Sequence, residues 1–588
     1  MPTKCASLFS ALTLHIALVL GQQSQIPGVG FPHDYPGKPE GDFSPAWQHC
    51  EAWKENFEVT EPLPNVTWPL PRNFAGNIPV DRPDHPNNTL FFWAWEKENG
   101  SLTANEFDRQ NEPWGIWLNG GPGASSMLGF LFENGPIHVA ANYSLFQNPY
   151  GWNLLADYIW IDQPVGVGYS TVDETGNVKD EDQMGEDFFR FLDNLVKVFP
   201  SLKHRPLHIT GESYAGTFIP YLAKTYFGLE DPPVKLEKIA IGDGTIGGTD
   251  GDPWEFEIMP TVTLLETYPQ LIGYDPDVFR YFQEQSHLCG FDLNLTYPQH
   301  GHFPTLNGIA GPLPSNSSQR ALKKSILKSA LKTDDRMKRT NMNARNLELD
   351  IARMQKRDQW KRDLRGRANG TIDPWYGCDI YDEMIDYALN FSLPWSAPMA
   401  FLDDLATNAT LKDVSVVIYS GNDDSLVSHR GSEDTLDSVI IQNTTFGGIQ
   451  GFSRRPSTPW YDDDGSYAGI VHQERNWTYV LVKGAGHFVP EQQPQRAFVM
   501  LREFILGHNE TGLVTISDGH TSVVGGEDPN FAGVLTGQSE IFTGSGMTEG
   551  AYTYPALTIA EWETFIAEAT ASPFTPTSSG HFAARTAS

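Results

Sequence analysis

The chain has 588 residues, of which 73 are acidic and 41 are basic, and its formal net charge at pH 7 is -32. Hydrophobic residues make up 40% and charged residues 19%, enough apolar material for a large core, which excludes a wholly disordered acidic chain. A surface this acidic repels phosphate backbones, so no nucleic-acid partner is expected. The charge is uneven, because residues 323–367 carry 15 basic and 6 acidic side chains, a net charge of +9.

The first 21 residues have the pattern of a secretory signal peptide. Lys4 precedes an apolar run from Ala6 to Leu20, and the small Gly21 follows this run. The run is shorter than the roughly 20 residues that span a bilayer, and His15 interrupts it. A cleaved signal peptide is therefore favoured over a membrane anchor.

Twelve Asn-x-Ser/Thr sequons also indicate passage through the secretory pathway. Their acceptors are Asn65, Asn87, Asn99, Asn142, Asn294, Asn316, Asn369, Asn390, Asn408, Asn443, Asn476 and Asn509. No second long apolar run follows, and the C-terminal residues lack the hydrophobic tail of a GPI signal. We expect no stable membrane anchor and a secreted protein, with the vacuole as the alternative destination.

Three cysteines remain once the one in the signal peptide, Cys5, is set aside. They are Cys50, Cys289 and Cys378, and they allow one internal disulfide at most. This excludes a disulfide scaffold and a cysteine-based zinc module. A bridge between Cys289 and Cys378 is favoured because it would close the base of the segment between them, but spacing leaves the pairing and the fate of Cys50 open. Neither a metal nor a cofactor is expected.

Strand-like and helix-like patterns alternate in two parts of the chain. Strands are expected at 89–95, 113–120, 156–162, 206–210 and 237–242, with a helix at 182–199, and further strands at 414–421 and 477–486. Strands that alternate with helices predict an α/β fold with a mostly parallel central sheet covered on both faces.

The same patterns divide the chain into segments. The prediction is a signal peptide (1–21), a first part of the α/β core (22–250), a largely helical insertion or cap (251–400) that contains the basic segment 323–367, a second part of the core (401–511) and a C-terminal extension rich in Gly, Ser and Thr (512–588).

The motif with the clearest chemistry is a serine between a strand and a helix. Ser213 lies in Gly-Glu-Ser-Tyr-Ala-Gly (211–216), directly after the strand at 206–210 and before a helical pattern. Such a turn is a nucleophile elbow, which lifts the hydroxyl group above the edge of the sheet. Residues 211 and 215 must be small because backbone crowds the bend, and Ala215 stands where the usual motif has glycine. Most serines in such a motif are ordinary loop residues, so the flanking strand and helix carry the argument.

A nucleophilic serine needs a base and a carboxylate that orients it. In α/β hydrolases the chain order is Ser, then Asp or Glu, then His. Asp423 and Asp424 directly follow one predicted strand, and His487 follows another. Both places are strand ends where open α/β sheets carry their sites. Taken singly, the aspartates are also typical of a turn, and His487 is one of 16 histidines.

Five blocks of sequence together resemble the serine carboxypeptidase family, in particular its secreted fungal members. They are WLNGGPGASSMLGFLFENGP (117–136), NPYGWN (148–153), DQPVGVGYS (162–170), GESYAG (211–216) and GAGHFVPEQQP (484–494). The resemblance implies an α/β-hydrolase fold and a serine-type carboxypeptidase. Such an enzyme hydrolyses C-terminal residues from peptides and proteins through an acyl-enzyme.

The resemblance also implies roles for single residues. Ser213 is the expected nucleophile and His487 the general base. Asp424 is the expected orienting carboxylate, because the family pattern G-D-x-D places it last. The backbone N–H groups of Gly121 and Tyr214 are expected to form the oxyanion hole.

Three further residues are implied to bind the substrate's free C-terminal carboxylate: Asn119, Glu133 and Glu212. Two glutamates bind an anion only if they hold protons, and clustered carboxyls raise each other's pKa. The expectation is an acidic optimum for peptide hydrolysis. In isolation, a solvated helix charge is the more usual explanation for Glu133, and a turn residue is the more usual explanation for Asn119.

This sequence departs from the family pattern at three places. Ala124 stands where the family commonly has cysteine after N-G-G-P-G, Asn422 replaces the first Asp of G-D-x-D, and residues 242–245 read GDGT where G-N-G-W is common. The local packing near these residues is therefore expected to differ.

The basic segment and the function each leave alternatives. The segment contains Lys338-Arg339, Lys356-Arg357 and Lys361-Arg362, which fit either a solvated helical face or a linker cut by a processing protease at dibasic sites. The alternatives to a carboxypeptidase are a secreted esterase or acyltransferase on the same fold, and a non-catalytic secreted glycoprotein. Substrate side-chain preference and oligomeric state do not follow from the sequence.

Overall fold

A computed structural model describes most of the two predicted core segments. The described residues are 57–60, 62–63, 65–140, 144–173, 175–246, 401–422, 452–517, 520–528, 540–543 and 550–570, with isolated residues at 269, 274–276, 279–280, 283, 297, 424, 427, 429 and 530. The signal peptide, the basic segment with its dibasic pairs, the three remaining cysteines and Asp423 lie outside the described residues. The division of the chain into segments stays a prediction.

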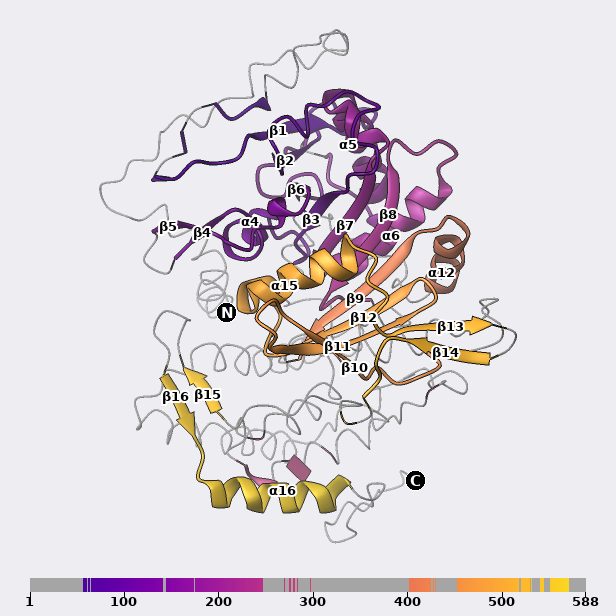
Figure 1. The fold of residues 1–588 in the computed structure, drawn as a ribbon. Coiled ribbons are helices and arrows are strands. Elements are labelled where there is room, and N and C mark those ends of the chain that lie inside the picture. Colours follow the sequence, from indigo (N-terminus) through magenta and orange to yellow (C-terminus); the bar gives the residue numbers. More distant parts are fainter. Residues whose placement is uncertain are drawn as a thin grey trace, which may run out of the picture.

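A twelve-stranded sheet forms the centre of the described structure (Figure 1). Its order is β1 (Asn73–Pro79), β2 (Thr89–Trp95), β6 (Asp157–Asp162), β3 (Trp114–Leu118), β7 (Pro206–Glu212), β8 (Lys235–Gly242), β9 (Ser415–Gly421), β12 (Trp477–Val482), β11 (Tyr467–Glu474), β13 (Leu513–Ser517) and β14 (His520–Val524), with β10 (Thr458–Tyr461) paired to β11. Neighbouring strands from β6 to β12 run parallel. The predicted strands and the mostly parallel sheet of an α/β-hydrolase fold are confirmed.

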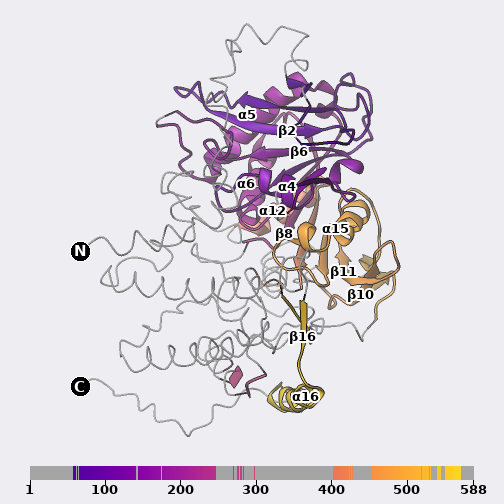
Figure 2. The ribbon, with the colours of Figure 1, turned by 90° about the vertical axis from the view of Figure 1, so that its left-hand side faces the viewer.

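Helices cover both faces of this sheet (Figure 2). One core cluster joins the sheet to α5 (Glu181–Val198), α6 (Ala215–Gly228) and α12 (Leu402–Leu411), and the other joins it to α4 (Met127–Phe132) and α15 (Pro494–Met500). Successive side chains of a strand enter different clusters: Ile116 faces the first and Trp117 the second. This alternation follows from the two-residue period of a strand and explains why these strands are apolar on both faces.

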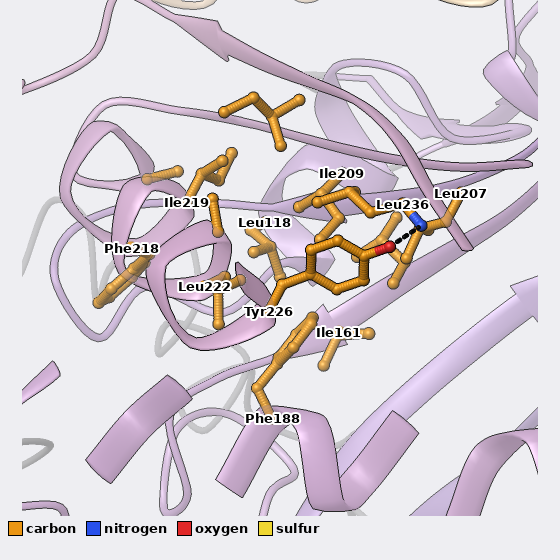
Figure 3. Close-up of a cluster of buried hydrophobic side chains, with 14 of the residues drawn as sticks. Leu118, Ile161, Phe188, Leu207, Ile209, Phe218, Ile219, Leu222, Tyr226 and Leu236 are labelled. Atoms are coloured by element: carbon orange, nitrogen blue, oxygen red, sulfur yellow. Dashed lines mark hydrogen bonds between the residues drawn. The ribbon is translucent and has the colours of Figure 1, made fainter. Parts of the chain in front are cut away.

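The helix that follows the nucleophile elbow is anchored in the first cluster. Figure 3 shows α6 packed between the strands and α5, through Phe218, Ile219, Leu222 and Tyr226. The backbone N–H of Leu236 in β8 also donates a hydrogen bond to the Tyr226 hydroxyl oxygen, over 3.3 Å. Full burial of each large apolar side chain contributes about 1.5–3 kcal/mol. The position of Ser213 is therefore set by a buried helix as well as by a buried strand.

The two halves of the core meet inside the sheet. The chain leaves the sheet after β8 and returns through α12 to β9, and β8 and β9 pair in parallel from Lys238–Ser415 to Gly242–Tyr419 (Figure 1). The C-terminal ends of β7, β8, β9 and β12 therefore lie in order along one edge. Residues that directly follow these four strands are brought together there.

Some strands lie outside the ranges assigned from the sequence patterns. No strand was expected at β1, whose sequence NFAGNIP contains residues that strands usually avoid, yet it pairs antiparallel with β2 over seven residues. The sheet also continues beyond residue 512, because β13 pairs in parallel with β11. Strands β15 (Glu540–Thr543) and β16 (Gly550–Thr553) form a separate hairpin. Tertiary pairing, rather than local propensity, decides these elements.

The C-terminal extension contains a helix that was not predicted. Helix α16 (Ala556–Thr570) packs against described residues of the 251–400 segment: Trp562 lies with its ring centroid 5.5 Å from that of the buried Phe279, and Arg280 lies over Phe565 at 4.9 Å. The extension and the insertion are thus in contact. Among the residues that the structure describes, no helix is long and apolar enough to cross a membrane.

Candidate active site

Ser213 occupies a tight turn between β7 and α6. Its φ is 60°, a left-handed conformation that is uncommon for a residue with a side chain. Three backbone hydrogen bonds hold it: Ser213 N–H donates to the Gly242 carbonyl (2.9 Å), and its own carbonyl accepts from Gly216 N–H (2.8 Å) and Thr245 N–H (3.0 Å). The turn is therefore fixed by β7, α6 and the residues after β8, as a nucleophile elbow requires.

Close backbone contacts explain the small residues around this turn. A Cβ atom added to Gly211 would lie 2.4 Å from the Leu118 carbonyl oxygen and 2.7 Å from Ala215 Cβ. One added to Gly120 would lie 2.3 Å from the Tyr214 backbone nitrogen. The Gly120-Gly121 turn therefore packs directly on the elbow. The structure thus brings together the two residues predicted for the oxyanion hole, Gly121 and Tyr214.

His487 and Asp424 form a hydrogen-bonded pair at the same edge of the sheet. The distance from His487 Nδ1 to Asp424 Oδ2 is 2.8 Å, and the Asp424 side chain is fully buried while that of His487 is 12% exposed. A carboxylate on Nδ1 fixes the tautomer, so that Nε2 is free to take a proton. The structure thus gives this contact to Asp424, while Asp423 lies outside the described residues.

The loop that carries His487 is held by its neighbours. A Cβ atom on Gly421, at the end of β9, would lie 2.4 Å from the Ala485 carbonyl oxygen, so the two segments touch through backbone. Gln493 Nε2 donates to the Gly484 carbonyl over 2.9 Å, and Gly486 N–H donates to the Gln492 side chain. These bonds connect the loop to the junction between α14 (Val489–Gln492) and α15.

Asn119, Glu133 and Glu212 form a buried cluster beside the elbow. Asn119 Nδ2 donates to Glu133 Oε1 (3.1 Å) and to Glu212 Oε1 (3.0 Å). The amide is oriented by its oxygen, which accepts from Trp117 Nε1 (2.8 Å) and Gly129 N–H (2.9 Å). All three residues of the cluster are at most 2% exposed. The structure thus brings together the three residues predicted to bind a carboxylate.

The two glutamates of this cluster favour the protonated state. Burial raises the pKa of Glu133, and burial together with the charge of Glu133 raises the pKa of Glu212 well above its ordinary value. The two glutamate side chains are in hydrogen-bond contact with each other, and the second oxygen of each, Oε2, is buried and accepts no hydrogen bond from another described residue. Protonated carboxyl groups at this place can donate hydrogen bonds to an anionic ligand.

Asp162 positions the loop before α4, a role that the sequence analysis missed. Its Oδ1 accepts hydrogen bonds from Ser125 Oγ (2.7 Å) and Ser126 N–H (2.8 Å), and its Oδ2 accepts from Tyr169 N–H (2.9 Å). Burial raises the pKa of Asp162 to about 6, although these bonds lower it. Asp162 is the first residue of the block DQPVGVGYS, and its position in this block is the sequence signal that could have pointed to a role near the site.

Glu181 was also missed, because nothing in the sequence connects it with the elbow. It lies fully buried in the first turn of α5, and the Tyr214 hydroxyl donates a hydrogen bond to its Oε1 over 2.9 Å. Burial raises the pKa of Glu181 to about 8, with smaller contributions from Asp180 and Asp182. Glu181 therefore fixes the side chain of the residue that follows the predicted nucleophile.

We expect Glu181→Gln to stabilise the protein at pH 8 and to change its stability little at acidic pH. In the unfolded chain this carboxyl ionises above its ordinary pKa of 4.5, whereas the folded state keeps the proton up to about pH 8. Each such group therefore lowers the free energy of unfolding by about 1.4 kcal/mol per pH unit within this window. Glutamine removes the titration and still accepts the Tyr214 hydrogen bond.

Denaturant unfolding at about pH 5 and about pH 8 measures this difference, which we expect to be roughly 2–5 kcal/mol at the higher pH. Glu186→Gln is the matched control, since Glu186 lies on the same helix with 59% of its side chain exposed. An equal effect of Glu181→Gln at both pH values would contradict the prediction.

The described glycosylation acceptors lie at or near the surface. Asn65, Asn87 and Asn99 are exposed, and Asn408, Asn476 and Asn509 are half-buried. Asn476 Nδ2 donates to the Val414 carbonyl over 2.8 Å. The other acceptors (Asn142, Asn294, Asn316, Asn369, Asn390 and Asn443) lie outside the described residues, as does the predicted Cys289–Cys378 bridge. Modification at these positions stays a prediction.

Comparison with known proteins identifies the family. A family model described as serine carboxypeptidase matches residues 64–268 and 368–507, more than half of the chain. The chain belongs to the serine carboxypeptidase family. Its unmatched part between the two ranges includes the whole basic segment 323–367, so the family pattern is interrupted where the charge is most unusual.

Curated relatives of this serine carboxypeptidase come from fungi. It is 29% identical over 512 residues to the pheromone-processing carboxypeptidase KEX1 of Chaetomium globosum, a match that covers 85% of this chain and 70% of the relative. It is 28% identical over 503 residues to a carboxypeptidase Y homolog of Arthroderma benhamiae, covering 77% of this chain and 94% of the relative. The predicted family and enzyme class are confirmed, and the esterase, acyltransferase and non-catalytic alternatives are not favoured.

Among solved structures, the chain is similar to the prohormone-processing carboxypeptidase Kex1(delta)p of Saccharomyces cerevisiae. The TM-score is 0.49 at 22% identity, and the match covers 80% of this chain and 99% of the other.

Proposed function

We propose that this serine carboxypeptidase holds the free C-terminal carboxylate of a peptide at Asn119, Glu133 and Glu212. The observation that carries the proposal is the buried pair of glutamates, which share one amide donor directly beside the elbow. The Oε2 atom of each glutamate is buried and accepts no hydrogen bond from any described residue outside this pair, so a bound ligand with acceptor atoms would satisfy the protonated carboxyl groups. The substrate's carboxylate can accept the hydrogen bonds that the protonated glutamate side chains donate.

The reaction that we propose begins at Ser213. His487 Nε2 takes the hydroxyl proton as Ser213 Oγ attacks the carbonyl carbon of the last peptide bond, and Asp424 stabilises the imidazolium that forms. The negative oxygen of the tetrahedral intermediate accepts hydrogen bonds from the Gly121 and Tyr214 backbone N–H groups. One such donor contributes about 10²–10³ to kcat in other serine enzymes.

The intermediate collapses to an acyl-enzyme as the last residue of the peptide leaves. His487 gives its proton to the leaving amine, and the peptide acyl group remains on Ser213 as an ester. A water molecule then loses a proton to His487 and attacks this ester, which releases the shortened peptide and restores the serine hydroxyl. Each turnover thus consumes one water molecule and releases one amino acid.

The sign of the pH dependence follows from the glutamate pair. The raised pKa values of Glu133 and Glu212 mean that the pair carries protons at acidic pH and loses them as the pH rises. The deprotonated pair repels the substrate's carboxylate, so substrate binding weakens as the pH rises. We therefore expect peptide hydrolysis to be most efficient at acidic pH.

The test compares a blocked dipeptide with its C-terminal amide and a simple ester, between about pH 4 and about pH 8. We expect hydrolysis of the free acid, a strong preference for it over the amide at acidic pH, and loss of this preference as the pH rises. Turnover of the ester alone would contradict the peptidase proposal, and inertness toward all three would favour a non-catalytic role.

We further propose that the protein follows the secretory pathway, to the outside of the cell or to the vacuole, and that a protease cuts at the dibasic pairs. The exposed acceptors Asn65, Asn87 and Asn99 support this route. The position of the pairs within the segment that the family model leaves unmatched supports the processing. Denaturing gels of the secreted protein, with and without reductant, test the cut. A single full-length band in both lanes would contradict it.

A further inference from the structure

Asp243 follows β8 at the edge where Ser213 follows β7. It is fully buried and has a φ of 42°. Its N–H donates to the Tyr419 carbonyl (2.9 Å), and its Oδ1 accepts from Gly421 N–H (2.9 Å), so β9 holds both its backbone and its side chain. This residue lies in the GDGT segment, where G-N-G-W is common in the family. The carboxyl group of Asp243 is thus fixed at the catalytic edge of the sheet, although it has no role in the reaction proposed above.

The side chain of Asp243 is in hydrogen-bond contact with that of Asp424. Its remaining oxygen, Oδ2, is buried and accepts no hydrogen bond from any residue that the structure describes. Two carboxylates in contact and out of water cannot both be ionised, so the pair keeps a proton. Because Asp424 already faces the His487 Nδ1–H group, the proton belongs on Asp243. Burial, and then the charge of Asp424, raise the pKa of Asp243 well above its ordinary value.

The other ionisable groups around this pair do not offer an alternative partner for Asp243. Glu212 on β7 and Tyr419 on β9 face it, and both are acids. His487 faces Asp424 from the loop after β12. Among these groups, only His487 can carry a positive charge. An ionised Asp243 would therefore face the acidic side chains of Glu212 and Tyr419 with no positive charge of its own among these groups. It would also compete with Asp424 for the His487 imidazolium.

We propose that Asp243 is a positioning residue that keeps its proton and donates a hydrogen bond from its O–H group to the Asp424 carboxylate. Asp424 then accepts two hydrogen bonds, from Asp243 and from His487 Nδ1–H, and is held in the orientation that fixes the histidine. A bond between a carboxylic acid and a carboxylate is charge-assisted and stronger than one between neutral groups. This inference rests on the proposed role of Asp424 in catalysis.

The orientation of Asp424 then depends on whether Asp243 carries its proton. At acidic pH the Asp243 donor is present. When Asp243 loses its proton at higher pH, Asp424 loses the donor and gains a negative neighbour, so its contact with His487 is disturbed. An asparagine would donate an N–H group at every pH. The acid at this position therefore makes full activity depend on a proton that is lost as the pH rises, independently of how the substrate's carboxylate is bound.

The test compares wild type with Asp243→Asn and Asp243→Ala. We measure kcat and KM with a blocked dipeptide, over substrate concentrations up to saturation, across the pH range. The alanine variant, which has no donor, should lose about 10- to 100-fold in kcat with little change in KM, a loss of the size seen when groups that orient metal-ligating side chains are removed. The asparagine variant should keep kcat within about threefold at acidic pH and retain it at alkaline pH, where wild type declines.

Asp463→Asn is the control for an acid-to-amide change, because Asp463 is a surface residue paired with Arg502 and half of its side chain is exposed. A folded alanine variant with the kcat of wild type would overturn the proposal. So would an asparagine variant with the same alkaline decline as wild type. If the alanine variant does not fold, the pH profiles of wild type and Asp243→Asn decide. Failure of the proposed function is distinguishable, because wild type would then be inactive on the peptide at every pH.

Discussion

Ser213→Ala reduces kcat/KM for peptide hydrolysis by about 10⁴- to 10⁶-fold, the range seen when the nucleophile of a serine triad is removed. The physical reason is that no acyl-enzyme forms without the hydroxyl group. What remains is catalysis by the oxyanion donors and by binding alone. Because alanine also carries a Cβ atom, the substitution keeps the backbone strain of the turn at φ 60° and the protein stays folded.

His487→Ala is the companion variant. The two residues act as a unit, so the double variant should be about as inactive as either single one. Ser466→Ala is the matched control, because Ser466 lies in an exposed turn after β10. The measurements are steady-state kinetics on a blocked dipeptide and thermal unfolding of each variant. Activity of folded Ser213→Ala near that of wild type would remove Ser213 as the nucleophile.

Replacement of both buried glutamates by glutamine abolishes the pH dependence of substrate binding. In wild type, KM rises by about tenfold per pH unit once the pair loses its proton, because one bound proton is linked to binding of the carboxylate. In Glu133→Gln/Glu212→Gln, the amide oxygens still accept from Asn119 Nδ2, and the amide nitrogens donate at every pH. The KM of the double variant should therefore stay constant over the pH range in which that of wild type rises.

The measurement is the pH profile of KM and kcat on a dipeptide with a free carboxylate. The proposed triad is unchanged in this variant, so we expect the difference in KM rather than in kcat. Glu98→Gln serves as the control, because Glu98 is 60% exposed and its only charged partner in the described structure is Arg109 on the surface. A double variant whose KM rises with pH as steeply as that of wild type would show that the glutamates do not control binding.

The sequence by itself determined the elements whose signals are local. The strands β7, β9 and β12 are buried on both faces, so apolar runs bounded by turn residues identified them. The elbow at Ser213 was predictable because a strand, a small-residue turn and a helix are consecutive in the chain. The order of Ser213, Asp424 and His487, each just after a strand, was sufficient to place them at one edge of a parallel sheet.

Resemblance to a family supplied the carboxylate-binding residues, which periodicity could not. Asn119, Glu133 and Glu212 are far apart in the chain, and each has an ordinary local explanation. Only the folded chain places one amide between two buried carboxyl groups. Their protonation depends on that burial, so it is a property of the tertiary structure.

Contacts between distant segments were decided by the tertiary structure alone. The pairing of β1 with β2 overrides a sequence with Gly and Pro, and the packing of Trp562 against Phe279 joins the extension to the insertion. The contact of Asp243 with Asp424 has the same origin, because the parallel pairing of β8 and β9 sets the two strand ends side by side. A side chain's local sequence limits its chemistry, but burial and neighbours from other strands set its charge, and these exist only once the sheet has formed.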